Sequence, residues 1–449
     1  MSNNMEDTNM TPKTKRALVP ELRFPEFRDA GEWINDPMAE LYTFKRTNSL
    51  SRDKLNYKNG SVKNIHYGDI HTKFFTHFDI QKEIVPYINP SESLNNVTPD
   101  SYCMEGDIIF ADASEDTDDI GKCIEVIMLN KERLLSGLHT ILARQKEKLM
   151  ITGFGGHLFR SDRIRKQIQN ESQGTKVLGL SVRRLASIEI CYPKNKAEQQ
   201  KIADCLSSLD DLTALEARKI DVLKAYKKGL MQQLFPAEGE TLPKLRFPEF
   251  LDAGEWIPYD LGDVVHFSSG GTPSKGIADY WGGTIPWISA SSMYEIYINK
   301  SELNVTPMAI GNGTRIAKKG SLLVLVRGSM LFNRIPMGIA SIDVAFNQDV
   351  KALEISDRLS NLFLLFQLIS FESRITISET GIGAGKIETD DLKNLAVFVP
   401  AIEEQQKIAD CLSSLDDLIA LQAQKLDALK AHKKGLMQQL FPSIDEVRK

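Results

Sequence analysis

The stretch EQQKIADCLSSLDDL, Glu198 to Leu212, returns without a single change as Glu404 to Leu418. The likeness continues to the next prolines, so that residues 198–236 and 404–442 share 33 of 39 letters. Repetition of a segment this long marks a structural unit that is used twice. The chain is therefore expected to be a tandem duplication.

A second repeated motif precedes each copy of the first. LRFPEFRDAGEWI, Leu22 to Ile34, recurs from Leu245 to Ile257 with one change in thirteen positions. Between the repeated motifs lie 163 residues in the first half and 146 in the second, and these inserts match only at landmarks such as GDIIF at Gly106 and GSLLV at Gly320. We interpret this as one fold that occurs twice, with different exposed residues in the two inserts.

The repeated 39-residue segment has the pattern of a long helix. Its apolar residues recur at steps of three and four, and Pro236 and Pro442 end its two copies. About 36 helical residues form a rod of roughly 55 Å, whose narrow apolar stripe needs a partner, and the obvious partner is the other copy. We expect an antiparallel coiled coil with one insert at each end and an approximate twofold axis. Its predicted seam consists of Ile202, Leu206, Leu209, Ile220, Leu223, Leu230, Leu234, Ile408, Leu412, Leu415, Ile419, Leu426, Leu429, Leu436 and Leu440.

Polar residues interrupt this seam at matching places in the two copies. Glu216 matches Gln422, and Lys227 matches Lys433. A polar residue in a coiled-coil seam can fix the register of the helices at some cost in stability.

Each insert is predicted to be an α+β domain. DIIFADA, KCIEVIML, TILAR, SLLVLV, VKALEI and LAVFVP are typical of short strands, and His157–Ser172 and Ser360–Ser373 are expected to be one helix in each insert. The predicted fold is thus two β-rich mixed domains separated by two long antiparallel helices. The expected boundaries are a loose tail at 1–18, a first domain at 19–196, a helix at 197–236, a linker at 237–244, a second domain at 245–402, a helix at 403–442 and a tail at 443–449.

The composition is that of an ordinary globular protein. Of 449 residues, 42% are hydrophobic and 26% charged, and the net charge of -5 argues weakly against a free-standing nucleic-acid binder. Five cysteines without a C-x-x-C pair fit neither a disulfide framework nor a zinc site, which favours a reducing cytoplasm. We find no apolar run of the roughly 20 residues needed to span a membrane.

Several motifs resemble catalytic or ligand sites but lack the required spacing. GIGAGK, Gly381 to Lys386, is not a phosphate-binding loop because Thr380 and Ile387 stand at two of its key positions, so we expect a turn. GGTPSKG, Gly270 to Gly276, is either a loop that contacts a phosphate backbone or a plain surface turn. SEDTDD, Ser114 to Asp119, is expected to be a solvated turn, with readout of cytosine as the minor alternative.

Histidines and aromatic residues gather in two places. His66, His71 and His77 are five and six residues apart, which matches no zinc pattern. YWGGTIPWISASSMY holds Trp281, Trp287 and Tyr294, which we expect to belong to a core rather than to a base-stacking surface. We identify no catalytic motif.

Taken together, the motifs resemble the specificity subunit of type I restriction-modification systems. The resemblance rests on LRFPEF…GEW, on GGTPSKG…YWGGTIPWIS and on DVAFNQDVKAL. It also rests on the start of each long helix, where a proline is followed, after four residues in the first copy and three in the second, by E-Q-x-x-I-A-x-x-L-x-x-L-D. These motifs cover nearly the whole chain, in both halves and in the expected order. The resemblance implies a non-catalytic subunit with two target recognition domains, each of which reads one half of a split sequence in double-stranded DNA.

The resemblance also implies partner proteins. The long helices would act as a spacer and would dock two methyltransferase subunits, and restriction/translocase subunits would complete the complex. S-adenosylmethionine, ATP and Mg²⁺ would be bound by those partners, and no membrane would be involved. In agreement, the chain has no N-P-P-[YF] motif and no Walker loop. Partner subunits that close around the duplex would also supply the positive field that this acidic chain lacks.

The residues that contact DNA do not follow from the resemblance, so we select polar residues on predicted loops. Thr175, Lys176 and Lys386 are candidates for backbone contacts because they lie on aligned glycine turns. The full set of candidates is Tyr67, His71, Lys73, Thr175, Lys176, Ser274, Lys275, Ser289, Ser291, Ser292, Arg327 and Lys386.

Two other functions compete with this interpretation. A coiled-coil interaction scaffold that does not bind DNA fits the composition and the acidic charge. A nuclease with duplicated catalytic domains fits less well, because two active sites would keep the same acids and bases in both inserts, and the polar letters of the inserts differ.

Overall fold

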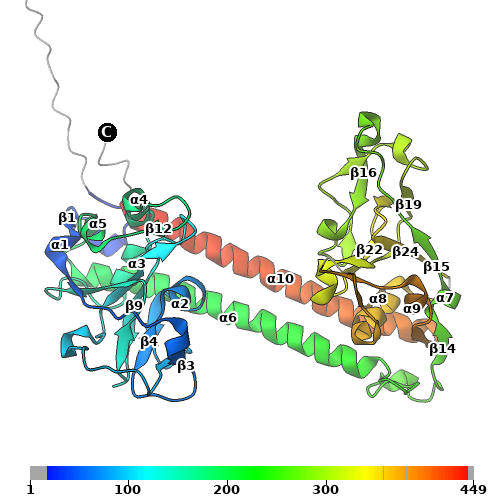
Figure 1. Ribbon diagram of the computed structural model, residues 1–449, viewed down its shortest axis with the longest axis horizontal. Coiled ribbons are helices and arrows are strands. Elements are labelled where there is room, and N and C mark those ends of the chain that lie inside the picture. Colours follow the sequence, from blue (N-terminus) through cyan, green and yellow to red (C-terminus); the bar gives the residue numbers. More distant parts are fainter. Residues whose placement is uncertain (1–17, 357, 381–382, 443–449) are drawn as a thin grey trace, which may run out of the picture. The chain divides into compact units, whose positions relative to one another are not determined.

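The computed structural model describes residues 18–356, 358–380 and 383–442, and it divides into two compact units (Figure 1). Unit 1 comprises residues 1–215 and 425–449, and unit 2 comprises residues 216–424. The predicted tails, apart from Leu18, lie outside the described residues, as does the start of the GIGAGK motif. Among the described residues, no helix is long and apolar enough to cross a membrane.

The globular part of unit 1, residues 18–195, is named head 1, and two sheets form its centre. The larger sheet has five strands, of which only β5 and β9 pair in parallel. Its order is β2 (Tyr42–Lys45), β11 (Thr140–Gln145), β7 (Ile108–Ala111), β9 (Cys123–Met128) and β5 (His77–Asp79). The smaller sheet has the order β10 (Leu134–Ser136), β4 (Lys63–Ile65), β6 (Tyr87–Ile88) and β3 (Leu55–Asn56).

Short elements complete head 1 around these sheets. Two strand pairs are β1 (Ile34–Pro37) with β13 (Glu189–Tyr192), and β8 (Ala113–Ser114) with β12 (Leu178–Gly179). The helices are α1 (Met38–Leu41), α2 (Tyr67–Thr72), α3 (Phe154–Phe159), α4 (Asp162–Glu171) and α5 (Val182–Ala186).

Head 2, residues 237–401, also contains a five-stranded and a four-stranded sheet. Its five-stranded sheet is β15 (Val265–Ser269), β24 (Val350–Ile355), β20 (Leu322–Leu325), β22 (Met337–Ala340) and β17 (Tyr297–Ile298). Its four-stranded sheet is β18 (Asn304–Val305), β16 (Trp281–Ile288), β23 (Val344–Phe346) and β19 (Arg315–Ala317). In both larger sheets the last strand joins in parallel and the others are antiparallel. The two inserts thus share one α+β fold.

The remaining elements of head 2 also have counterparts in head 1. β14 (Ile257–Asp260) pairs with β27 (Ala396–Val399), and a further sheet has the order β21 (Arg327–Gly328), β26 (Ala384–Lys386) and β25 (Ser378–Thr380). The helices are α7 (Leu261–Val264), α8 (Asn361–Ser370) and α9 (Thr389–Lys393). All six segments predicted as strands contain strands.

The helix predicted at His157–Ser172 is wrong as a single element. The structure ends α3 at Phe159 and begins α4 at Asp162, because Ser161 adopts an extended conformation with ψ 148°. Serine followed by aspartate is a common helix start, since serine favours the N-cap position and an acidic residue favours the first turn. The second predicted helix is confirmed as α8, whose cap Ser360 accepts a hydrogen bond from the Phe363 amide.

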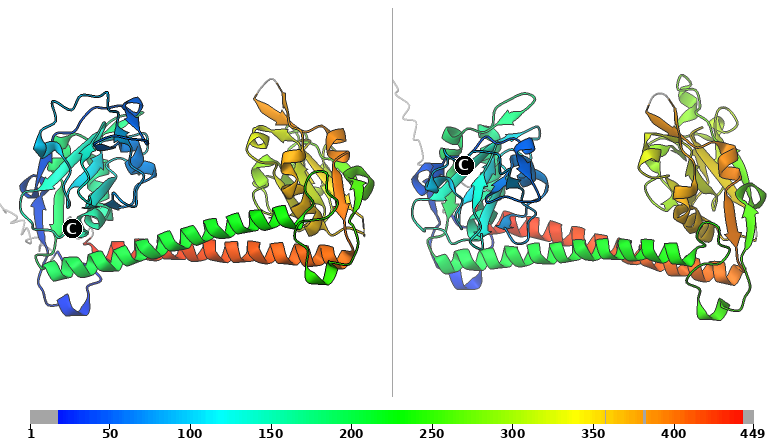
Figure 2. Two further views of the ribbon diagram at one scale, coloured as in Figure 1. Left: turned by 90° about the horizontal axis from the view of Figure 1, so that it is seen from below. Right: turned by 60° about the horizontal axis from the view of Figure 1, so that its bottom comes forward.

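Two long helices, α6 (Lys196–Leu234) and α10 (Ile402–Leu440), pass through both units. Within unit 1, Leu440 at the end of α10 shares a core with Ile202 near the start of α6. Within unit 2, Leu234 at the end of α6 shares a core with Ile408 near the start of α10. The helices are therefore antiparallel in each unit, as the views in Figure 2 also show. Every residue of the predicted seam is buried or partly buried.

The polar residues that interrupt the predicted seam pair with each other across the helices. In unit 2, Lys227 lies 2.6 Å from both carboxylate oxygens of Asp416, and Gln422 donates to Glu216. In unit 1, Lys433 donates to Asp210, the counterpart of Asp416. The interruptions therefore form hydrogen bonds that require one alignment of the two helices.

A buried ion pair, here named a clasp, joins each repeated leading motif to the start of a long helix. In unit 1 the Arg23 guanidinium donates two bonds of 2.7 Å to the Glu198 carboxylate, and in unit 2 Arg246 makes bonds of 2.7 and 2.8 Å to Glu404. Both glutamates are fully buried. The clasps give a physical reason why LRFPEF…GEWI and the EQQ letters recur together.

Candidate nucleic-acid interface

Strand ends and loops gather at one end of head 2 around the turn Asn347–Asp349. The Asn347 amide donates to the carbonyl of Ile288, the last residue of β16, over 2.9 Å. The Val326 amide, directly before β21, donates to the Asp349 carbonyl over 2.7 Å. We name this surface the polar edge of head 2, and it consists of residues 270–272, 289–292, 326–328, 347–349 and 386.

Head 1 builds an equivalent edge around its turn at residues 137–139. The Gly137 amide donates to Ile65, the last residue of β4, and the Asp112 amide donates to His139 over 3.0 Å. These bonds repeat the arrangement of head 2, in which the same turn is bonded to the ends of the same two strands. The polar edge of head 1 consists of residues 48, 66–71, 112–114 and 137–139.

The candidate residues of head 1 do not all lie on this edge. Tyr67 begins α2 and lies with its ring edge-on to the rings of His71 and His139. Lys73 lies past the end of α2 and forms an ion pair with Asp69 over 2.9 Å. Thr175 and Lys176 are exposed on the turn before β12, the strand that pairs with β8.

In head 2 most candidate residues lie together. Arg327 on β21 is directly opposite Lys386 on β26. Ser289, Ser291 and Ser292 follow β16, and the hydroxyl oxygens of Ser289 and Ser291 are 3.0 Å apart. Ser274 and Lys275 are also exposed, but they lie further along the loop that starts at Gly270.

Charges on the edge of head 1 are largely paired. Asp69 is buried, which by itself would raise its pKa, but hydrogen bonds from Arg52 and Lys73 lower that pKa. Burial and the nearby Arg52 charge lower the pKa of His66. Burial raises the pKa of Asp112, and the ion pair with His139 opposes this effect. Asp112 and His139 thus present carboxylate oxygens and an imidazole ring at a half-exposed surface.

The edge of head 2 carries an exposed arginine, Arg327. Arg327 is exposed, and no ion pair is recorded for it among the described residues, whereas Lys386 pairs with Glu388. The Thr272 hydroxyl donates to the Gln348 side-chain oxygen over 2.7 Å, which orients the exposed amide group. An arginine and an oriented amide are the groups that most often read guanine and adenine in the major groove.

Sequence analysis missed His139 and the turn Asn347–Asp349. His139 has a left-handed backbone conformation with φ 55°, which is uncommon for a residue other than glycine. The DVAFNQDVKAL motif contains the turn of head 2, but the motif alone does not show that strand ends distant in sequence meet there.

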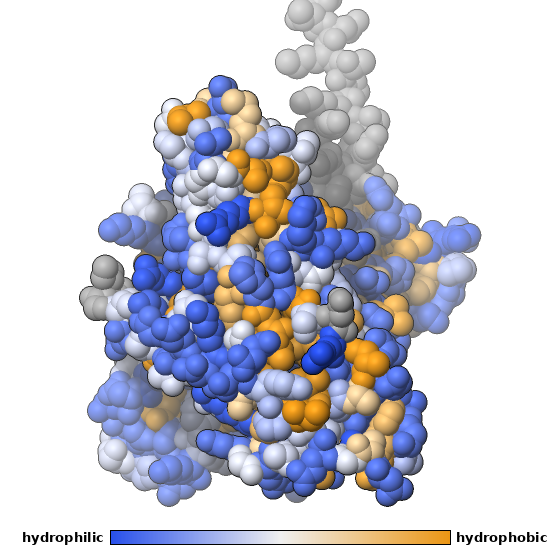
Figure 3. Space-filling view, turned by 90° about the vertical axis from the view of Figure 1, so that its right-hand side faces the viewer, coloured by the Kyte–Doolittle hydropathy of each residue, from blue (hydrophilic) through white to orange (hydrophobic). Residues whose placement is uncertain are grey.

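The aromatic prediction was correct for the tryptophans and wrong for Tyr294. Trp281 and Trp287 pack with ring centroids 5.4 Å apart in a small core. Tyr294 is 66% exposed, because its chain leaves the sheet after β16 and returns only at β17. Hydrophobic residues interrupt the hydrophilic surface in a band on the face of head 2 shown in Figure 3.

SEDTDD and GIGAGK are two further motifs that resemble ligand sites. Within the described part of the chain, no group of three or more histidine, cysteine or acidic residues is placed to hold a metal ion. Glu115 to Asp118 are exposed, as expected for a solvated turn. The described part of GIGAGK, Gly383 to Lys386, continues into β26, which pairs with β25.

Comparison with known proteins identifies the class. The family model of the type I restriction modification DNA specificity domain matches residues 52–225 and 253–431. The chain belongs to this family and contains two copies of its domain. Membership of this family identifies it as a DNA-recognition subunit rather than an enzyme.

Individual relatives agree with this assignment. The chain is 26% identical over 336 residues to the type I restriction enzyme MjaVIII specificity subunit of Methanocaldococcus jannaschii, which covers 70% of this chain and 75% of the relative. It is 28% identical over 230 residues to the EcoR124I/EcoR124II specificity subunit of Escherichia coli, which covers 50% of this chain and 53% of the relative.

Solved structures share the fold. The S subunit of a type I restriction-modification system from M. genitalium superposes with a TM-score of 0.54 at 15% identity, and covers 95% of this chain and all of that one. A chain from a structural study of complex assembly and conformational transition in a type I R-M system superposes with a TM-score of 0.59 at 18% identity, and covers 91% of this chain and 97% of that one.

Proposed function

We propose that head 1 and head 2 each read one half of a bipartite, asymmetric DNA site through their polar edges. The observation that carries the proposal is that both heads build the same edge from the same strand ends but occupy it with different polar residues. His139 and Tyr67 are on the edge of head 1, and Arg327 and Gln348 are on the edge of head 2. Different side chains on one scaffold give two different half-sites, since base edges are distinguished by the donors and acceptors that meet them.

The two long helices set the spacing of the half-sites in this proposal. Their paired polar residues fix one alignment of the two helices. The residues of either head can therefore change without a change in the spacing between the half-sites. A scaffold that does not bind DNA would have no use for polar edges that differ between otherwise equivalent heads, and the family assignment does not favour it.

The helices also dock two copies of one partner, the methyltransferase subunit. The argument comes from exposed residues. Leu215 and its counterpart Leu421 are 60% and 63% exposed, and both follow an exposed aspartate and leucine that are also duplicated. Packing within the chain does not explain why these exposed residues are identical in the two copies. Contact of each copy with the same partner protein would explain it.

Further along the helices, some exposed residues differ between the copies. Val222 is 67% exposed and its counterpart is an alanine, and Tyr226 is 59% exposed and its counterpart is a histidine. We therefore place the docking face on residues 208–215 and 414–421.

The chemistry belongs to the partners in this proposal. Methyltransferase subunits bind S-adenosylmethionine and methylate adenine, and restriction/translocase subunits use ATP and Mg²⁺ to move and cut DNA. The complex acts on DNA in the cytoplasm. This chain contributes binding, orientation and spacing.

Mapping of methylated adenines tests the reading function. The chain is assembled with its methyltransferase subunits, and methylation is mapped over a randomised DNA library for the wild type, Arg327→Ala and Lys318→Ala. Arg327→Ala should relax one base preference in one half-site, because a bidentate contact to a base is worth about 1–3 kcal/mol. Lys318 is a matched control, since it pairs with Asp343 at the opposite end of β23.

An unchanged recognition sequence for Arg327→Ala would remove this residue from the interface. Methylation without any sequence preference in the wild-type complex would contradict the proposed function itself.

Native mass spectrometry tests the docking face. Leu215→Glu and Leu421→Glu should each lose one methyltransferase subunit, and the double variant should lose both. Val222→Glu, at an exposed position that differs between the copies, should keep two. Retention of two partner subunits by the double variant would refute this face.

A further inference from the structure

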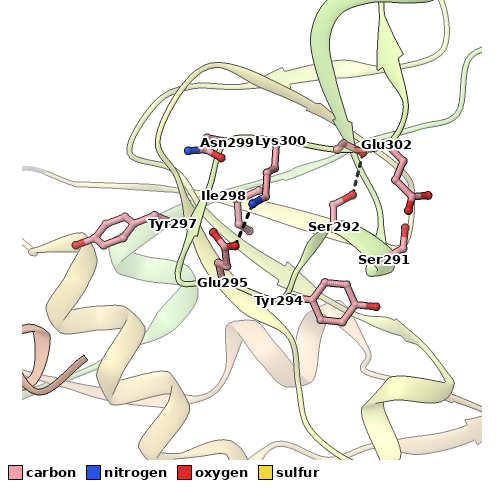
Figure 4. Close-up of a pocket in the computed structure, with 10 residues that line it drawn as sticks. Ser291, Ser292, Tyr294, Glu295, Tyr297, Ile298, Asn299, Lys300 and Glu302 are labelled. Carbon is pink, nitrogen blue, oxygen red and sulfur yellow. Dashed lines mark hydrogen bonds and ion pairs between the residues drawn. The ribbon is translucent and has the colours of Figure 1, made fainter. Parts of the chain in front are cut away.

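A cavity of about 310 Å³ lies beside the polar edge of head 2 (Figure 4). Its lining comes from the segment between β16 and β18, and it shares Ser291 and Ser292 with the edge. The volume is at the lower end of the range for small-ligand pockets, which suits an occupant of the size of one nucleotide.

The lining offers both an aromatic face and polar groups. Tyr294 lies on the same side of the cavity as Ser291 and Ser292, and the side chains of Glu295 and Lys300 face each other across from them (Figure 4). Hydroxyl groups donate and accept hydrogen bonds, as the edges of bases require. A tyrosine ring stacks on any base, because every base has a π face.

A cation at the cavity is available for a phosphate group. Lys300 pairs with Glu295 over 3.1 Å, but both side chains are largely exposed, at 78% and 63%. Exposed ion pairs contribute little stability, so Lys300 can leave Glu295 for a phosphate at low cost.

Head 1 exposes an aromatic residue on the equivalent turn. Phe75 is 56% exposed and comes directly before Thr76, whose carbonyl accepts from the Glu125 amide of β9. In head 2 the carbonyl of Ile296, two residues after Tyr294, accepts from β22 in the same way. The heads differ in most exposed residues, yet each exposes an aromatic ring on this turn.

We propose that the cavity receives one base of the DNA, unstacked beside the half-site that head 2 reads, with Tyr294 stacked on it. This inference rests on the proposed reading function and adds a residue that acts on DNA shape. Continuity with the polar edge favours a base of bound DNA over a free nucleotide, which would have no need of a place beside that edge.

Fluorescence of 2-aminopurine tests this proposal in the assembled complex. The analogue is placed at each position of the duplex in and next to the half-site of head 2, and an unstacked base becomes brighter. We expect a rise at one position other than the methylated adenine. Tyr294→Ala should abolish the rise and weaken binding roughly 5- to 150-fold, the range found when an aromatic ring that stacks on a base is removed.

Two further variants make the result specific. Tyr294→Phe keeps the ring and should keep both signals. Met308→Ala truncates another side chain of head 2 that is 60% exposed, and it should behave as the wild type. Retained assembly with the methyltransferase subunits shows that each variant is folded.

The possible outcomes separate this inference from the proposed function. Sequence-dependent binding with no position whose brightness depends on Tyr294 overturns the inference and leaves the reading function intact. Loss of sequence dependence in the wild-type complex overturns the reading function. Binding of dAMP to the free chain that depends on Tyr294, without a signal in the duplex, overturns the DNA base as occupant.

Discussion

Removal of the glutamate from each clasp should destabilise the two units by different amounts. In unit 1, Glu198 accepts two 2.7 Å bonds from Arg23 and a 3.2 Å bond from the Trp33 indole. Glu198→Ala leaves the Arg23 guanidinium buried without its counter-charge. Breaking a buried pair in this way costs about 3–5 kcal/mol of the free energy of unfolding.

The second clasp provides a matched comparison because it lacks the tryptophan bond. Trp256 is buried, and its indole nitrogen has no hydrogen-bond partner among the described residues. In that part of the chain, Glu404 accepts side-chain hydrogen bonds from Arg246 alone. Glu198→Ala also leaves the Trp33 nitrogen unsatisfied, which adds about 1–3 kcal/mol. We therefore expect Glu198→Ala to cost more than Glu404→Ala by about that amount.

Hydrogen exchange during urea unfolding is the suitable assay, because two units need not unfold in one step. Amides of residues 22–34 report on unit 1 and amides of residues 245–257 report on unit 2. Each single variant should lose protection in its own unit, and replacement of both Arg23 and Glu198 by methionine should recover most of the loss, since no buried charge then remains. Equal losses in the two units, or losses below about 1 kcal/mol, would refute this reasoning.

Three further predictions concern single residues. Burial and the neighbouring positive groups hold the pKa of His157 well below its usual value, so unit 1 should lose stability as pH falls below about 6.5. The variant His157→Phe introduces the residue type of Phe366 in head 2 and should reduce this loss of stability in thermal melts. An unchanged pH profile would contradict the argument. Lys433→Met breaks the bond to Asp210 and should cost about 1 kcal/mol in urea unfolding, with no effect on the recognised sequence. Gly121→Ala should lower the free energy of unfolding by about 2–4 kcal/mol, because φ is +64° and a Cβ atom would lie 2.4 Å from a side-chain methyl group of α4. A loss below about 1 kcal/mol would show that α4 can shift to make room for the methyl group.

The long helices and the duplication could be predicted because their signals are local. Steps of three and four between apolar residues predict a helix without knowledge of the rest of the chain. The near-identity of the two copies indicates that they form the same structural element. The break at Ser161 was missed because apolar residues lie on both sides of it, at Phe159 and Ile164, and the helix-start signal of Ser161 and Asp162 between them was not used.

The polar edges could be predicted only in part, because they are assembled from distant segments. Tyr67 and Ser289 were selected as polar residues on predicted loops, which is a local property. His139 and Gln348 reach the edge only because the turn that carries them is hydrogen-bonded to the end of a strand more than fifty residues away in the chain. A sequence pattern does not contain that pairing.

The clasps show a signal that the sequence did contain. Arg23 and Arg246 recur with Glu198 and Glu404, and opposite charges that recur together across a long insert indicate contact. The clasp residues and the exposed residues of 208–215 are both identical in the two copies, but the clasps are buried whereas the helix face is exposed. A buried pair is retained because losing one partner leaves an unpaired charge, whereas an exposed identical face has no such internal reason. The proposed docking of the same partner on both copies accounts for this second identity.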